Sequence, residues 1–308
     1  MDGVLVIDKP AGPTSHDVVA RVRRVLRERR VGHTGTLDPG ATGVLALVLG
    51  RATRLAQFLA GSDKAYEAVV RFGFATDTAD AQGRAIGSAS GAPAPPRAAI
   101  DAALAAFRGT FMQQPPAFSA KRIDGTRSHK LARARARAAQ EIRDLPDPPG
   151  LPDPVSVTAH AIDIIAADGD TATLRVECSA GFYVRALAHD LGERLGIGAH
   201  LVSLRRTRAG DFRLEDALPL EAAERDPDRA RAAVVPLPDV LPRLPAVRLN
   251  ADGVRRAING CELGQRDGVP GGQRAESLVR LLTPAGDLVG VARAGSGPGL
   301  LHPAVVLR

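Results

Sequence analysis

Short β-rich runs and amphipathic helical segments intermix irregularly along this chain of 308 residues. A doubly wound parallel sheet requires a regular strand–helix–strand rhythm, because each parallel strand needs a crossover before the next. The apolar runs here lack that rhythm, and no internal repeat is seen. The pattern therefore favours an α+β fold. Because aromatic residues make up only 3% of the chain, its core must consist mainly of Val, Leu, Ile and Ala.

The N-terminal region has the clearest local signals. Residues 3–7 are β-rich, and residues 8–13 are turn-rich. Thr14 and Asp17 have the spacing of a helical capping box. Apolar residues then recur at helical spacing, with arginines between them: Val18, Val19, Val22, Val25 and Leu26. We expect a strand, a loop and an amphipathic helix with a basic outer face.

Similar patterns predict the remaining elements. Strands are expected at 44–49, 66–74, 155–165 and 171–178, and helices at 52–59, 98–107 and 183–195. Residues 31–43 are expected to form a loop. Two β-rich runs, 277–283 and 287–294, flank a Pro-Ala-Gly turn and predict a hairpin.

Segments rich in proline and glycine divide the chain. Residues 87–96 and 145–154 are expected to be surface connections, and 235–245 marks a boundary. We predict one large domain at 1–240 and a small C-terminal module at 246–308, since a domain usually holds roughly 100–200 residues.

The balance of charge is basic, with 41 Lys and Arg residues against 34 Asp and Glu residues. An excess of positive charge favours a polyanionic partner such as nucleic acid. An Arg- and Ala-rich composition would raise the isoelectric point in the same way without any such partner.

The chain has two cysteines, Cys178 and Cys261, which is too few for a disulfide framework or a zinc set. The longest apolar run, 44–49, is far shorter than the ~18 residues that a membrane helix needs. The N-terminus does not have the pattern of a signal peptide. We therefore expect a cytoplasmic protein without a membrane partner.

The segment 31–43 is the most informative for chemistry. It reads VGHTGTLDPGATG, and its glycines at 32, 35, 40 and 43 suggest unusual dihedral angles or close approach to a ligand. Asp38 lies in this segment before Pro39, which disfavours a helical conformation. Asp38 is either a catalytic carboxylate or a residue that only caps local amides in an Asx-turn.

Other candidates each have a structural alternative. Arg185 could pair with a buried carboxylate through its planar fork, or lie on the surface. Tyr66 and Tyr183 are the only tyrosines, and each could stack on a flipped base or pack against a strand. His33 could bind RNA or be structural. Two basic clusters fit phosphate contacts or solvated faces: Lys121, Arg122, Arg127, Lys130, Arg133, Arg135 and Arg137, and Arg205, Arg206 and Arg208.

No metal site emerges. Asp77 and Asp80 lack the ligand spacing and the terminal Glu of a calcium loop, and no phosphate-binding P-loop is present.

Five ordered blocks over residues 3–210 resemble the bacterial TruB family of tRNA pseudouridine synthases. They read GVLVIDKPAGPTSHDVVARVRR, VGHTGTLDPGATG, KAYEAVVRFGFATDTADAQG, QQPPAFSAKRIDGTRSHKLAR and ECSAGFYVRALAHDLGERLGIGAHLVSLRRTRAG. The resemblance implies a catalytic domain with a mixed or antiparallel sheet. It also implies an RNA-binding thumb at about 110–143 and a small C-terminal β-barrel module of the PUA type.

The resemblance also implies roles for individual residues. Asp38 matches the catalytic aspartate, Arg185 its arginine partner, and Tyr66 the tyrosine that stacks on the target base. Lys9 supports the active site, and His33 binds the flipped nucleotides. The other implied RNA-binding residues are Tyr183, Leu204 in the wall of the uracil pocket, and Lys121 and Arg122 in the thumb.

The implied reaction converts uridine 55 in the T-loop of tRNA to pseudouridine, without a cofactor or metal. We expect a monomer whose partner is the T-arm stem-loop. A further role in tRNA folding is compatible with this activity. Two other classes fit parts of the sequence: a non-catalytic RNA-binding module, and a guide-RNA-dependent synthase subunit. The long basic insert favours the stand-alone enzyme.

Overall fold

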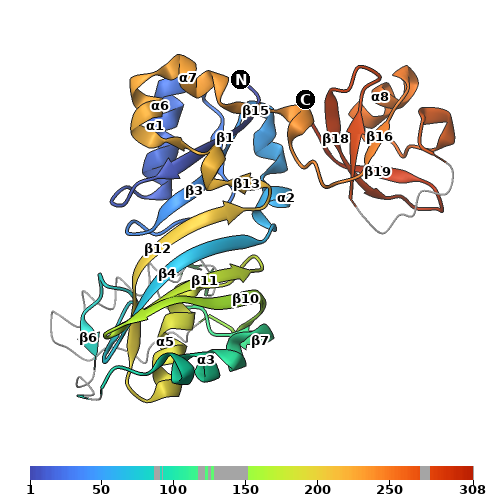
Figure 1. Ribbon diagram of the computed structural model, residues 1–308. Helices are drawn as coiled ribbons and strands as arrows, with labels where there is room; N and C mark the ends of the chain where they lie inside the picture. Colours follow the sequence, from blue (N-terminus) through green and yellow to red (C-terminus); the bar gives the residue numbers. More distant parts are fainter. Residues whose placement is uncertain are drawn as a thin grey trace. The chain divides into compact units, whose positions relative to one another are not determined.

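The computed structural model describes residues 1–86, 91, 93–116, 122–123, 126–127, 152–270 and 278–307. The chain divides into two compact units, Met1–Ser62 with Arg208–Arg308, and Asp63–Thr207. Both units contain helices and antiparallel strand pairs (Figure 1). This arrangement confirms the predicted α+β class. Within the described ranges, every helix is too short or too polar to span a lipid bilayer.

The first unit begins with β1 (Gly3–Lys9), α1 (Ser15–Leu26), β2 (Val31–His33), β3 (Thr42–Leu49), η1 (Gly50–Leu55) and α2 (Ala56–Ala60). Strands β1 and β3 and helix α1 are confirmed, whereas the single helix predicted at 52–59 is divided between η1 and α2. β1 pairs antiparallel with β3 along its whole length. The prediction that 31–43 is all loop is wrong at its start, because β2 pairs with the end of β3.

The predicted capping box at the start of α1 is confirmed. The Thr14 hydroxyl accepts a 3.1 Å hydrogen bond from the Asp17 amide, and the Asp17 carboxylate accepts one of 2.8 Å from the Thr14 amide. Val18 and Val22 on the apolar face are fully buried. α1 packs against α6 (Leu220–Arg225) and α7 (Pro227–Ala232), beside β1 (Figure 1).

The later part of this unit completes the same sheet. β14 (Leu218–Pro219) pairs parallel with β1, and β15 (Val234–Pro236) pairs antiparallel with it. The remaining elements before the C-terminal segment are β13 (Phe212–Arg213), η3 (Leu214–Asp216) and η4 (Leu237–Asp239).

The C-terminal segment forms a second, four-stranded sheet in the order β16-β17-β18-β19. Its elements are β16 (Ala246–Arg248), α8 (Ala251–Ile258), η5 (Gln265–Asp267), β17 (Val279–Leu282), β18 (Leu288–Ala294) and β19 (Leu301–Val306). The predicted hairpin is confirmed as β17 and β18. The segment has its own core, which includes Val247, Leu281 and Leu301.

The C-terminal segment was predicted to form a closed barrel, but the structure shows an open sheet among the described residues. Among the described residues, β16 and β19 are the edges of an open sheet. Apart from its pairing with β18, the start of β19 forms only one isolated bridge within the described residues, with Leu263. The predicted boundary between 1–240 and 246–308 stays a prediction.

The second unit is built on a sheet in the order β12-β4-β11-β10-β7. Its elements are β4 (Lys64–Phe72), β5 (Ala75–Thr76), β6 (Ala85–Ile86), α3 (Arg97–Leu104), η2 (Ala105–Phe107), β7 (Gly109–Gln113), β8 (Arg122–Ile123), β9 (Thr126–Arg127), β10 (Val155–Asp168), β11 (Thr171–Cys178), α5 (Val184–Leu195) and β12 (Ala199–Ala209), whose last two residues belong to the first unit. The predicted pairing of 155–165 with 171–178 is confirmed by β10 and β11. Helices α3 and α5 pack side by side (Figure 1). As predicted, α5 ends at Gly196, which has a left-handed φ of 70°.

Candidate active site

Asp38 lies in the loop between β2 and β3, and hydrogen bonds hold the residues of this loop that are next to Asp38. The Pro39 carbonyl accepts a 2.8 Å hydrogen bond from the Gly12 amide. The Asp38 carbonyl accepts one of 3.1 Å from the Ala41 amide, which closes a tight turn. The side chain of Asp38 is half-buried. A carboxylate on such a fixed loop has a defined position, which a catalytic group requires.

Lys9 anchors this loop from β1. Its side chain is fully buried, and its ammonium donates hydrogen bonds of 2.9, 3.2 and 2.8 Å to the carbonyls of Pro10, Pro39 and Ala41. A buried ammonium is stable only where acceptors replace its hydration. Lys9 therefore ties the Asp38 loop to the central strand, which is compatible with the expected supporting role.

Ser15, in the first turn of α1, holds the residue before Asp38. Its hydroxyl accepts a 2.9 Å hydrogen bond from the Leu37 amide and donates one of 3.0 Å to the Leu37 carbonyl. Ser15 is almost completely buried. No sequence pattern indicates this contact, because Ser15 has the appearance of an ordinary first-turn residue.

The glycines of 31–43 are less unusual than predicted. Of these four glycines only Gly43 has a left-handed φ, of 99°. Gly32 lies in the regular strand β2, where an added Cβ would only make an ordinary 3.5 Å contact with the Val48 side chain. His33 ends the same strand and contacts the exposed His16 ring edge-on, at 5.3 Å between ring centroids.

In the second unit, Tyr66 lies in the middle of β4 and is 8% exposed. Lys64 shares its side of the strand, because side chains alternate along β4, and Lys64 is also buried. Burial, followed by repulsion from Arg206, lowers the pKa of Lys64 to about 8, although Cys178 and Asp63 act in the opposite direction. The sequence analysis missed Lys64, whose only signal was a lysine at the start of an apolar strand.

Arg185 is buried in the first turn of α5, so the alternative of a surface arginine is excluded. One guanidinium nitrogen donates a 3.1 Å hydrogen bond to the Thr78 carbonyl and lies 3.8 Å from the Asp80 carboxylate. The predicted pairing of Arg185 with Asp38 stays a prediction.

The loop that carries Thr78 and Asp80 is itself rigidly held. Asp80 accepts hydrogen bonds from the Thr78 hydroxyl at 2.7 Å and from the Gln82 amide at 3.0 Å. Ala79 has a left-handed φ of 60°, and a Cβ on Gly83 would lie 2.3 Å from the Thr78 hydroxyl. Such strained backbone persists only where its surroundings determine it. The sequence pattern around Asp80 was tested only against a calcium loop, which it does not match, and its contact with Arg185 was not predicted.

Tyr183 directly precedes α5 and is half-buried. Leu204 is half-buried on β12. α5 packs against β4, the strand that carries Tyr66. Lys121 lies outside the described residues, and Arg122 is described only as part of the β8 backbone. Most of the predicted basic cluster at 121–137 therefore has no structural description.

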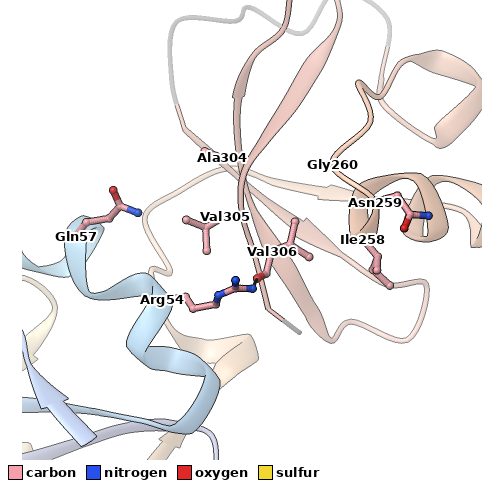
Figure 2. A pocket seen from close by; sticks show the side chains of 8 residues that line it. All are labelled: Arg54, Gln57, Ile258, Asn259, Gly260, Ala304, Val305 and Val306. Atoms are coloured by element: carbon pink, nitrogen blue, oxygen red, sulfur yellow. Dashed lines mark hydrogen bonds between the residues drawn. The ribbon is translucent and has the colours of Figure 1, made fainter. Parts of the chain in front are cut away.

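Two cavities lie away from all of these residues. One, of about 480 Å³, is lined by Arg54, Gln57 and residues of α8 and β19, and Arg54 reaches the Val306 carbonyl at its edge (Figure 2). The other, of about 530 Å³, lies beside α3 and β10 in the second unit. In the described parts of the chain, no group of three or more His, Cys, Asp or Glu side chains is arranged to hold a metal.

Comparison with known sequences identifies the family. Residues 23–184 match the N-terminal domain of TruB family pseudouridylate synthases, and residues 185–239 match a tRNA pseudouridylate synthase B C-terminal domain. A tRNA pseudouridine synthase B of Solibacter usitatus is 43% identical over the full length of both chains. One of Cupriavidus metallidurans is 42% identical over 96% of this chain and 91% of its own.

Solved structures share the fold. A Cbf5-Nop10-Gar1 complex contains a chain that matches 99% of this one with a TM-score of 0.72 and 26% identity, over 85% of its own length. An H/ACA RNP bound to a substrate RNA gives a TM-score of 0.71 with 25% identity, over 99% of this chain and 85% of its own. These matches agree with the sequence comparison, and this chain therefore belongs to the TruB family of pseudouridylate synthases, as an isomerase of that class.

Proposed function

We propose that this chain converts uridine 55 in the T-loop of tRNA to pseudouridine, with Asp38 as the catalytic carboxylate. The observation that carries the proposal is the anchored loop around Asp38, in a family of pseudouridine synthases. The relatives' name, tRNA pseudouridine synthase B, supports tRNA as the substrate.

The reaction is an isomerisation, so no co-reactant is consumed. The bond between N1 of the base and C1′ of the ribose breaks, the base rotates, and a new bond forms between C5 and C1′. The proton on C5 is released and N1 takes up a proton. Asp38 acts either as a nucleophile at the sugar or ring, or as a base, and both routes require its ionised form. We assign Arg185 the role of charge partner to this carboxylate, because a planar guanidinium can pair with a carboxylate through two hydrogen bonds.

The target uridine must leave its stack, which costs a few kcal/mol. We propose that stacking on the ring of Tyr66 offsets part of this cost. Leu204 and Tyr183 would line the uracil pocket, and His33 would bind the flipped nucleotides. Lys121 and Arg122 would contact phosphates from the thumb, and Lys9 would hold the Asp38 loop.

The C-terminal segment at 246–308 would serve as an RNA-binding module of the PUA type, and the chain would act as a monomer. A hydrophobic cluster of its own, which includes Val247, Leu281 and Leu301, supports this role. An additional role in tRNA folding is compatible with this arrangement.

The guide-RNA-dependent class is the second candidate, because the similar solved structures include archaeal H/ACA complexes. Their identity of 25–26% is well below the 43% shared with a tRNA pseudouridine synthase B. The higher identity over the full length favours the stand-alone enzyme.

The test is incubation of the purified chain with an unmodified T-arm stem-loop, followed by mass spectrometry that locates pseudouridine. We expect product at position 55 without any guide RNA. A stem-loop with cytidine at position 55 is the matched control and should give none. Product at another position, or only with a guide RNA present, would contradict the proposal.

A further inference from the structure

Gln113 is a polar side chain in an unusual place. It ends β7, where its own side chain is 1% exposed while the neighbouring Met112 is 63% exposed. It is the one fully buried residue of this five-residue strand. Burial of an amide is unfavourable unless its polar atoms are paired, so the contacts of Gln113 define why a glutamine occupies this position.

Both ends of the Gln113 amide bond to the backbone of a single residue, Tyr183. The Gln113 Oε1 atom accepts a 2.8 Å hydrogen bond from the Tyr183 amide, and its Nε2 atom donates one of 3.0 Å to the Tyr183 carbonyl. The side chain thus replaces the strand partner that this extended residue, with φ −110° and ψ 107°, would otherwise need. An aromatic contact between Phe111 of β7 and Phe182, at 6.0 Å, supports the same connection.

This contact lies at the residue that directly precedes α5. Tyr183 precedes the helix and supplies no side-chain cap, although its carbonyl also accepts a 3.1 Å hydrogen bond from the Leu187 amide. Arg185 lies two residues further on, in the first turn. A change in the position of the Tyr183 backbone would therefore move the base of the Arg185 side chain.

The same strand is the root of the predicted thumb. Gln113 lies opposite Val155 in the pairing of β7 with β10. The next residue, Gln114, donates a 2.5 Å hydrogen bond from its side chain to the Pro152 carbonyl. Gln114 and Pro152, at the two ends of the intervening segment, therefore lie close together next to Gln113.

We propose that Gln113 is a positioning residue for pseudouridine formation, which fixes Tyr183 and the first turn of α5 and connects them to the root of the thumb. The inference rests on the proposed function for its activity readout, but its structural part can be measured without any turnover.

Gln113→Met and Gln113→Glu test this role in the full-length chain. Met retains bulk but removes both hydrogen bonds. Glu retains the acceptor for the Tyr183 amide, but when ionised it faces the Tyr183 carbonyl with a second acceptor. Arg108→Met is the matched control in the same unit. It removes two side-chain hydrogen bonds, of 3.2 and 3.0 Å, to the Ile162 carbonyl of β10, and an exposed 2.6 Å ion pair with Asp101.

Single-turnover rates at saturating tRNA and amide hydrogen exchange over residues 183–187 are measured for all four proteins. We expect Gln113→Met to lower the rate constant at least about tenfold, within the loss that a small misplacement causes, with tRNA affinity within about threefold. Exchange at 183–187 should become faster in this variant, whereas Arg108→Met should match wild type in both measurements. For Gln113→Glu, the rate relative to wild type should rise as pH falls, because the protonated carboxyl can donate to the Tyr183 carbonyl.

The inference is overturned if Gln113→Met exchanges like wild type at 183–187, whatever its activity. It is also overturned if the rate loss equals that of Arg108→Met, or if Gln113→Glu has a flat ratio to wild type across pH. Failure of the proposed function would be distinguishable from these results, because wild type itself would then form no pseudouridine at position 55. Hydrogen exchange at 183–187 would still test whether Gln113 holds the Tyr183 backbone.

Discussion

The guanidinium of Arg185 lies 3.8 Å from the carboxylate of Asp80 and donates a hydrogen bond to the Thr78 carbonyl, so one loop supplies two groups that orient it. Arg185 and Asp80 are both largely enclosed, with side-chain exposures of 8% and 20%. An ion pair with so little solvent around it is screened much less than one on the surface.

Asp80→Asn should therefore slow catalysis while leaving tRNA binding nearly intact. The amide retains an acceptor for the Thr78 hydroxyl but removes the negative charge beside Arg185. We expect a single-turnover rate constant at least about tenfold lower, since orientation of a charged group near the reaction centre affects the rate strongly. Asp77→Asn in the same loop is the control, and equal losses in the two variants would contradict the assignment.

Ser15→Ala should weaken the anchoring of the Asp38 loop. Both polar groups of Leu37 lose their partner, which costs about 1–3 kcal/mol of unfolding free energy. The rate constant should also fall. Thr14→Ala, which removes the helix cap at a cost of about 1 kcal/mol, should destabilise the chain without a comparable loss of rate. Denaturant unfolding and single-turnover assays measure both effects, and a normal rate in Ser15→Ala would show that Leu37 does not need this contact.

Lys64 predicts a specific dependence of stability on pH. Its pKa is lowered from 10.5 to about 8 in the folded chain, mainly by burial. Below the lower value both states are protonated, and the full cost of burying the ammonium is present. Between the two values the unfolded state binds more protons, so the unfolding free energy rises with pH.

Comparison of wild type with Lys64→Met isolates this effect. The difference in unfolding free energy between them should shift in favour of wild type by roughly 2 kcal/mol from about pH 7 to about pH 10. Urea unfolding at a series of pH values provides the measurement. Parallel curves for the two proteins would mean that the pKa of Lys64 is not lowered by folding.

Affinity for tRNA should fall steeply with salt, because Lys and Arg release counterions from the RNA backbone when they bind. We expect a loss of at least about tenfold between roughly 50 and 200 mM salt. Neutralising Lys121, Arg122 and Lys130 together should weaken binding and reduce the slope. Filter binding or fluorescence titration would show this, and a slope equal to wild type would remove these residues from the interface.

Local signals in the sequence were sufficient for elements whose contacts are local. The capping box of Thr14 and Asp17 and the apolar spacing after it predicted α1, and Gly196 marked the end of α5. The three-residue strand β2 was missed, because its only support is pairing with β3. The closed C-terminal barrel was expected from the family and is not seen among the described residues.

The candidate site shows the same division. Asp38, Tyr66 and Arg185 are predicted as site residues because they lie in blocks that resemble the family. Gln113 and Thr78 were not found, since their partners lie 70 and 107 residues away in sequence. A glutamine in a strand or a threonine in a polar loop has no pattern that indicates such a distant backbone contact. Only the folded chain identifies the residues that hold the predicted ones in position.

The central claim is that Asp38 is the carboxylate that performs the isomerisation. The most direct measurement is single-turnover conversion of an unmodified tRNA transcript by wild type and Asp38→Asn, with mass spectrometry at position 55 and tRNA affinity measured in parallel. We predict that wild type forms pseudouridine at position 55 and that Asp38→Asn forms none, although it binds the transcript within a few-fold of wild type. Pseudouridine formation by Asp38→Asn at a rate near that of wild type would contradict the claim.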